Sequence, residues 1–329
     1  MLELALQNLL SPMILCFGLG LAAALARSDL SIPEAVAKGL SIYLLFAIGF
    51  KGGVSLNEAG IDARAGGALA LGVVLSAGMP VAAFALLALL TRLGPTDRAA
   101  VAAHYGSISI VTFVTAISVL DAASVAHDGF MIAVAAAMEA PAILTALWLA
   151  ARAGGLSAAP GPDGPGAHGL WREIMLNGSI VLLLGAFLIG WITGPAGMAE
   201  IDGFITMPFK GMLCLFLLDM GLVAGRSLRA ARGTMTPGLV AFGVLMPLLG
   251  GGFGLMAGVV LGLEAGSAAL FAVLAASASY IAVPAAMRLA LPEANPGVYL
   301  TLSLGVTFPF NLTFGIPLYL GAAQFFAGG

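Results

Sequence analysis

The chain contains a long internal repeat. Residues 38–56 read KGLSIYLLFAIGFKGGVSL and residues 210–228 read KGMLCLFLLDMGLVAGRSL, so seven of nineteen positions are identical at an offset of 172 residues. A duplicated and strongly apolar chain of this size is typical of secondary transporters built from two inverted repeats. The repeat therefore predicts two related halves, each with the same set of helices.

The repeat continues into later parts of both halves. At the same offset, Gly106-Ser107 aligns with Ala278-Ser279. Further along, the offset falls to 168, where Glu139 aligns with Thr307. The two halves are thus expected to place similar polar and small residues at equivalent positions.

The composition indicates a membrane protein with several spans. Apolar residues make up 60% of the chain and charged residues 9%, and the mean hydropathy is +1.07. No soluble domain buries that much apolar surface. Cys16 and Cys214 lie within apolar runs and are expected to pack there, without forming a disulfide or a metal site. The sequence contains no basic patch of the kind that binds nucleic acid. The first apolar run lacks the basic leader that is typical of a cleavable signal peptide.

Apolar runs separated by polar or Pro/Gly-rich segments predict ten transmembrane helices. The first five are expected at 9–26, 34–50, 66–91, 99–120 and 130–151, and the second five at 174–193, 204–224, 239–262, 267–291 and 297–326. The fold class predicted is an all-α integral membrane protein with two inverted five-helix repeats, at 1–152 and 171–329. Between them, 153–170 is rich in proline and glycine and is expected to be a cytoplasmic linker.

The distribution of basic residues predicts the orientation. Nine of the thirteen lysines and arginines lie in or beside odd-numbered loops: Arg27, Arg92, Arg98, Arg152, Arg172, Arg226, Arg229, Arg232 and Arg288. Positive charge marks the cytoplasmic side, so these loops should be inside and both termini outside the plasma membrane. Five spans per half is an odd number, and equivalent helices would therefore cross in opposite directions.

Two predicted spans contain polar interruptions that could bind a substrate. The fourth reads His-Tyr-Gly-Ser-Ile-Ser at 104–109, and the ninth reads Ser-Ala-Ser-Tyr-Ile-Ala-Val-Pro at 277–284. Broken helices expose backbone groups and helix N-termini, which suit anions and ions near the membrane midplane. Small residues also serve close helix packing, and that alternative stays open for each segment taken alone. The substrate-binding candidates are Gly106, Ser107, Ser109, Thr112, Ser277 and Ser279.

A second set of residues could bind a coupling cation. Glu139 lies within the fifth span, where a carboxylate is costly unless it has a function or a hydrogen-bonding partner. Its repeat counterpart Thr307 precedes a proline, and Asn311 follows that proline. Oxygen atoms of these side chains are of the kind that hard cations prefer. Glu139, Thr307 and Asn311 are therefore the candidates for cation coupling, with Glu139 alternatively a proton carrier or a structural carboxylate.

Four further polar residues remain open in role. His104 could carry a proton, donate to an anion or pack, and Tyr280 lies in the ninth-span interruption. Asp219 is inside the seventh span, with function and a structural hydrogen bond equally open. Lys51 ends the second span and is expected to extend its ammonium group to the membrane surface.

Enzyme signatures are missing from the sequence. There is no HExxH, GxSxG or Walker A motif and no cysteine–histidine cluster with metal spacing. The chain is therefore predicted not to be an enzyme and to use no cofactor. Transport would have to run on an ion gradient.

The chain resembles the sodium-dependent bicarbonate symporters of the cyanobacterial type (SbtA-like permeases) over nearly its whole length. The matching segments are Ser11-Pro12, Ile32-Pro33-Glu34-Ala35, Ile48-Gly49 through Gly52-Gly53, the trio Gly106, Ser109 and Thr112, Met138-Glu139-Ala140-Pro141-Ala142, Ala275-Ala276-Ser277 through Pro284, then Arg288, Pro292 and Ala294-Asn295-Pro296. No single segment is diagnostic, whereas their order along ten spans is fairly specific.

The resemblance implies a fold, a function and partners. Helices one, two, six and seven would form a gate domain and the others a core domain with crossing broken helices. Family members are homotrimers that couple bicarbonate uptake to sodium, and some are inhibited by a PII-like protein. The sodium ion would be the coupling ion. Carried over, the substrate site would contain the six residues named above.

The chain departs from the family pattern near this site. Tyr280 stands where an acidic residue is expected, Ala282 and Val283 replace small or polar positions, and Ile110 replaces a glycine. The leading hypothesis is a sodium-coupled symporter for a small anion, bicarbonate first, that works by alternating access. The alternatives are a sodium- or proton-coupled transporter of a small organic anion and a non-transporting receptor or scaffold.

Overall fold

The computed structural model describes residues 10–60, 63–139, 141–153, 178–231 and 233–327, and these residues are helical with no strand. The first half contains α2 (Pro12–Leu25), α3 (Glu34–Ala59), α4 (Ala63–Leu90), α5 (Pro95–Gly106), α6 (Ile110–Ala122), α7 (Met131–Ala137) and α8 (Pro141–Arg152). The second half contains α10 (Gly178–Ile205), α11 (Phe209–Ala230), α12 (Pro237–Val260), α13 (Ala265–Ala276), α14 (Ala282–Ala290) and α15 (Pro296–Leu300), then two π-helical turns, η1 (Thr301–Thr307) and η2 (Asn311–Gly315), around α16 (Phe308–Phe310), and finally α17 (Ile316–Ala327).

Eight helical stretches within the described residues are long and apolar enough to cross a membrane. Three of them combine shorter elements: α5 with α6, α7 with α8, and α15 through α17. The predicted first and ninth spans correspond to the shorter helices Pro12–Leu25 and Ala265–Ala276. A multi-pass helical membrane protein is thus confirmed, and the count of ten spans remains a prediction. The proposed linker beyond Ala153, together with Arg172 and Arg232, lies outside the described residues.

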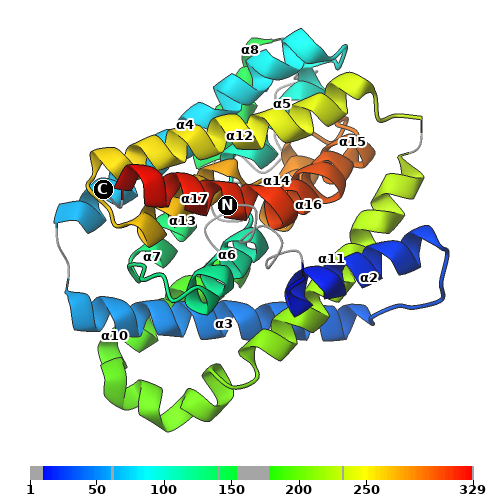
Figure 1. Ribbon diagram of the computed structural model, residues 1–329. Helices are drawn as coiled ribbons and strands as arrows, with labels where there is room; N and C mark the ends of the chain where they lie inside the picture. The colour runs from blue at the N-terminus through cyan, green and yellow to red at the C-terminus, as the bar shows by residue number, and fades with distance from the viewer. Residues whose placement is uncertain (1–9, 61–62, 140, 154–177, 232, 328–329) are drawn as a thin grey trace, which may run out of the picture.

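The repeated glycines of α3 and α11 are contacts between helices. α3 packs along α10, and α2 packs along α11 (Figure 1). A Cβ added to Gly53 would collide with the carbonyl oxygen of Phe187 in α10, and one added to Gly221 would collide with that of Phe17 in α2. Glycine at these positions lets the two backbones approach closely, as is common in membrane helix pairs. Part of the repeat is therefore explained by packing.

A second group of helices encloses the broken segments. α12 packs against α13, and α4 packs against α5 and α8. Figure 1 shows α4, α8 and α12 on one side of the molecule, with α2, α3, α10 and α11 on the other. Every residue of α13 except its first is buried. This buried helix and α5 bring the two interruptions into the centre.

Both predicted interruptions are confirmed as breaks in the helices. α5 and α13 are each 12 residues long and each ends at an extended serine, Ser107 with φ −83° and ψ 164° and Ser277 with φ −82° and ψ 161°. The helices before the breaks thus end 170 residues apart, at Gly106 and Ala276, whereas the helices after them begin 172 residues apart, at Ile110 and Ala282. The alignment of Ser107 with Ser279 at an offset of 172 residues stays a prediction.

Substituting Gly53 with alanine should destabilise the protein, because the new methyl group meets the Phe187 carbonyl. We expect a loss of about 1–3 kcal/mol, seen as a lower midpoint of thermal unfolding in detergent. Gly39→Ala is the matched control on the same helix, since a Cβ there would meet nothing within 4 Å. Equal midpoints for the two variants would contradict this account of the α3–α10 contact.

Candidate functional site

The two broken segments hydrogen-bond to each other. The backbone N–H of Ser109 donates to Oγ of Ser277 at 2.8 Å. The backbone N–H of Ser279 donates to the carbonyl oxygen of His104 at 2.7 Å. Each interruption thus satisfies polar groups of the other, which is the condition for tolerating non-helical backbone at membrane depth.

Serines at the breaks also accept hydrogen bonds from the helices that follow. Ser109 is the N-cap of α6, and its Oγ accepts from the backbone N–H of Thr112 at 3.2 Å and from the Thr112 hydroxyl at 2.9 Å. Ser279 Oγ accepts from the backbone N–H of Val283 at 3.5 Å, in the first turn of α14. The N-termini of α6 and α14 therefore both begin at the meeting point of the breaks.

Glu139 lies at a third break, between the end of α7 and the start of α8. Its side chain is 2% exposed, and its Oε2 accepts from the hydroxyl of Ser107 at 2.9 Å. Among the described residues, no basic group lies within ion-pair distance of it. The preceding carbonyl, of Met138, accepts from Ser76 Oγ at 2.6 Å. A buried carboxylate with one hydroxyl partner retains capacity to bind a cation or a proton.

These groups line a small cleft. Its lining comprises Ile108, Ser109, Ile110, Glu139, Ser279, Tyr280 and Ile281. Four predicted site residues face this cleft, and Ser107, Thr112 and Ser277 bond directly to members of that set. We call this the central cleft. Ser109, Ser279, Glu139 and Tyr280, which the sequence singled out as polar candidates, thus lie together at this cleft.

Tyr280 occupies the cleft with a ring and a hydroxyl group. Its ring packs edge-on against Phe308, with centroids 5.3 Å apart. The hydroxyl is buried near Ser109 and forms no well-aligned hydrogen bond within the part of the chain described. Tyr280 therefore offers a buried donor to whatever enters the cleft.

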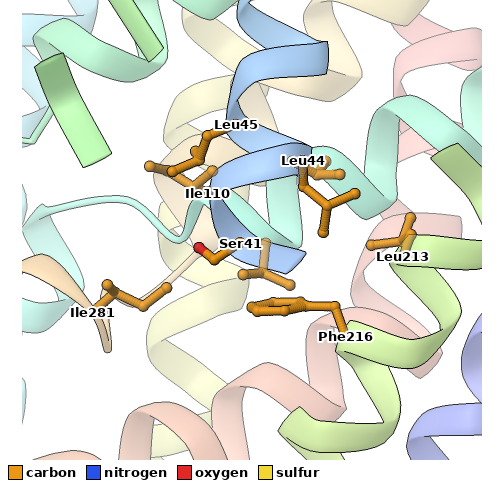
Figure 2. A pocket seen from close by; sticks show the side chains of 9 residues that line it. Ser41, Leu44, Leu45, Ile110, Leu213, Phe216 and Ile281 are labelled. Carbon is orange, nitrogen blue, oxygen red and sulfur yellow. The ribbon is translucent and has the colours of Figure 1, made fainter. Parts of the chain in front are cut away.

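A second, apolar cleft adjoins the first. Figure 2 shows Leu44 and Leu45 of α3 and Phe216 of α11 facing the break residues Ile110 and Ile281. Ile110 and Ile281 line both clefts. The predicted gate helices thus contact the central cleft through these two isoleucines. Nothing in the sequence distinguished these apolar residues from other lipid-facing or core positions.

Thr307 and Asn311 have partners of their own. Thr307 Oγ1 donates to the carbonyl of Gly243 at 2.7 Å, so it accepts from the Tyr105 hydroxyl, 2.6 Å away. Asn311 Nδ2 donates to the carbonyl of Ala276, the last residue of α13, at 2.9 Å. Neither bonds to Glu139 among the described residues. Both lie in π-helical turns, which often occur at functional positions. A shared cation site of the three remains a prediction.

The remaining candidates are placed as follows. Gly106 packs against α4 and α8, because a Cβ there would collide with the Pro80 ring and approach Ala142 to 2.8 Å. His104 is fully buried, with Nδ1 donating to the Ala100 carbonyl at 2.6 Å and its ring stacked on Tyr299. Its Nε2 has no partner in the described region. Asp219 is buried on α11, outside the central cleft.

Replacing Ser277 with alanine should destabilise the protein by about 1–3 kcal/mol, because the buried N–H of Ser109 loses its acceptor. The thermal unfolding midpoint in detergent measures this. Ser118→Ala is the control, since that hydroxyl is equally buried and has no hydrogen-bond partner among the described residues. If Ser118→Ala lowered the midpoint as much as Ser277→Ala, the hydrogen bond from the Ser109 N–H to Ser277 Oγ would not be important for the stability of the protein.

Comparison with known proteins gives the chain a family. No individually curated protein matches it. The sequence profile of the Na+-dependent bicarbonate transporter superfamily matches residues 12–324, which is nearly the whole chain and includes every break described above. The chain belongs to the Na+-dependent bicarbonate transporter superfamily.

Proposed function

We propose that the chain is a sodium-coupled symporter that carries a small anion, bicarbonate first, by alternating access. The observation that carries this proposal is the central cleft, where serine hydroxyls, two helix N-termini and the buried Glu139 converge. Family membership supports sodium and bicarbonate as the transported species.

The chemistry of the cleft suits an oxyanion. Helix N-termini carry partial positive charge and free N–H groups, and α6 is 13 residues long. The hydroxyls of Ser109 and Ser279 and the phenol of Tyr280 supply further donors. Bicarbonate carries one negative charge and can both accept and donate hydrogen bonds, which matches hydroxyl groups.

Sodium has a separate role in this proposal. The cation binds near Glu139 and the oxygen atoms of Ser107 and Ser109, where a buried carboxylate otherwise lacks a counter-charge. With the cation in place, the site becomes attractive to an anion, because the local negative charge is neutralised. In this proposal Thr307 and Asn311 have one of two roles. They stabilise the ends of the broken helices, or they become sodium ligands after a conformational change.

Alternating access requires two bodies that move against each other. We assign α2, α3, α10 and α11 to the gate and the remaining helices to the core. Two observations support this assignment. The first-half helices α2 and α3 pack along the second-half helices α11 and α10, respectively. The interrupted helices α5 and α13 have equal lengths, as inverted repeats would have. Trimer formation, a PII-like regulator and termini on the outer face belong to the same proposal.

The first experiment is uptake of radiolabelled bicarbonate into proteoliposomes, with and without an inward sodium gradient. The proposal predicts accumulation that requires the gradient. Folded protein that accumulates no bicarbonate under either condition would contradict the choice of substrate, and a screen of small organic anions would follow.

Substituting Glu139 with alanine should reduce sodium-dependent uptake to the background of empty liposomes, because the cation loses the one carboxylate that lines the cleft among the described residues. Glu264→Ala, at an exposed position before α13, is the control and should retain uptake. Both variants must elute as monodisperse species on gel filtration. Sodium-dependent uptake retained by Glu139→Ala would exclude the assigned role.

A proton-coupled transporter of a small organic anion is the second candidate. The Nε2 of His104, which has no hydrogen-bond partner among the described residues, and the buried phenol of Tyr280 favour it, since both could take part in proton transfer or contact an organic group. This candidate requires uptake that follows the pH gradient and does not respond to sodium.

A further inference from the structure

Three aromatic rings connect α2 with the central cleft. Phe17 of α2 packs edge-on against Phe308 of α16, with ring centroids 5.4 Å apart and an angle of 78° between the ring planes. Phe308 also packs edge-on against Tyr280, at 5.3 Å and 67°. Tyr280 lines the central cleft, whereas Phe17 and Phe308 do not. We call these three side chains the ring series.

The ring series joins the two groups of helices. Phe17 belongs to the group formed by α2, α3, α10 and α11, and Phe308 belongs to the other group, which encloses the breaks. Both side chains are buried. Among the described residues, the pair of Phe17 and Phe308 is the one aromatic contact between the two groups. Phe308 therefore touches a helix of the first group and a residue of the cleft at the same time.

The phenol of Tyr280 has no acceptor within the described part of the chain. Its neighbour Ser109 Oγ already accepts from the backbone N–H and from the hydroxyl of Thr112. A hydroxyl oxygen has two lone pairs, so neither is left for the phenol. A buried donor without a partner is costly, which favours a ligand that supplies an acceptor. No hydrogen bond in the described chain thus fixes the direction of this donor.

Ring packing has to orient the phenol instead. Tyr280 lies between α13 and α14, where the backbone is not helical. Phe308 directly follows the π-helical turn η1, and η2 begins three residues later at Asn311. Such turns often occur at functional positions. Edge-to-face packing has a preferred geometry, so the contact with Phe308 restricts the position of the Tyr280 ring.

We propose that Phe308 is a positioning residue of the substrate site: it orients the phenol of Tyr280 toward an oxygen atom of a bound small oxyanion. Phe17 holds Phe308 from the side of α2, so a movement of that helix changes the position of the donor. The inference rests on the proposed function for the identity of the anion. The contact of Phe308 with Tyr280 and the response of Tyr280 to anions can be measured without transport.

Fluorine NMR of protein labelled with 3-fluorotyrosine provides the first test, because the chain has five tyrosines. The Tyr280 resonance is identified by its loss in Tyr280→Phe. Sodium bicarbonate should shift this resonance, and sodium chloride at the same concentration should not. Phe308→Leu should move the resonance of the anion-free protein and raise the bicarbonate concentration at half of the full shift about threefold. Phe308→Met is the second variant if Phe308→Leu does not fold.

Phe310→Leu is the matched control on the same short helix. Phe310 packs against Phe314 and not against Tyr280. This variant should leave both the Tyr280 resonance and its response to bicarbonate unchanged.

Uptake provides the second measurement. Tyr280→Phe should raise the KM for bicarbonate about fivefold to tenfold with little change in kcat, because one hydrogen bond to the bound anion is lost. Phe308→Leu should raise the KM about threefold in the unsubstituted chain but not in a Tyr280→Phe chain, because it acts through the phenol. Tyr43→Phe is the control for losing a phenol, since the Tyr43 hydroxyl donates to the carbonyl of Phe204, and it should leave the KM unchanged.

A Tyr280 resonance that does not respond to Phe308→Leu would overturn the proposal, and so would additive effects of Phe308→Leu and Tyr280→Phe on the KM. If the unsubstituted chain transports no bicarbonate, the proposed function fails, and the resonance is also titrated with sodium formate and sodium nitrate. A shift with any of the three anions that Phe308→Leu weakens supports the positioning role. No shift with any of them overturns it.

Discussion

The structure depends on the hydrogen bonds between two broken helices. A helix that stops inside an apolar environment leaves backbone groups without partners, at a cost of several kcal/mol each in hydrocarbon. Here the N–H of Ser109 donates to Ser277 Oγ, and the N–H of Ser279 donates to the His104 carbonyl. Because each break supplies what the other lacks, neither is stable alone. This mutual dependence creates a polar cleft in the middle of an apolar protein.

The helices around the breaks divide by how they pack. Glycine contacts hold α3 to α10 and α2 to α11, so these pairs are close and stiff. This group faces the breaks through bulky apolar side chains such as Leu44 and Phe216, opposite Ile281 of the second break. Apolar contacts are not directional, and they allow two packed groups to shift more readily than hydrogen-bonded ones do. The polar site thus lies beside an apolar contact surface between the two helix groups.

Much of the site could be predicted from the sequence, since its polar residues stand out in apolar surroundings. Ser109, Ser279, Glu139 and Tyr280 all line the central cleft. The partners of Thr307 and Asn311 could not be predicted, because the Gly243 and Ala276 carbonyls carry no side-chain signal.

The sequence by itself determined that the chain is a helical membrane protein, that its fourth and ninth spans are interrupted, and which family it belongs to. These properties follow from hydropathy and from the order of residues along the chain, which are local. Only the tertiary structure decided that Ser109 meets Ser277, 168 residues away, and that Lys51 lines a cavity with Asp121 and His127. Contacts at such separations depend on how whole helices pack, and packing is fixed by the fit of many side chains at once.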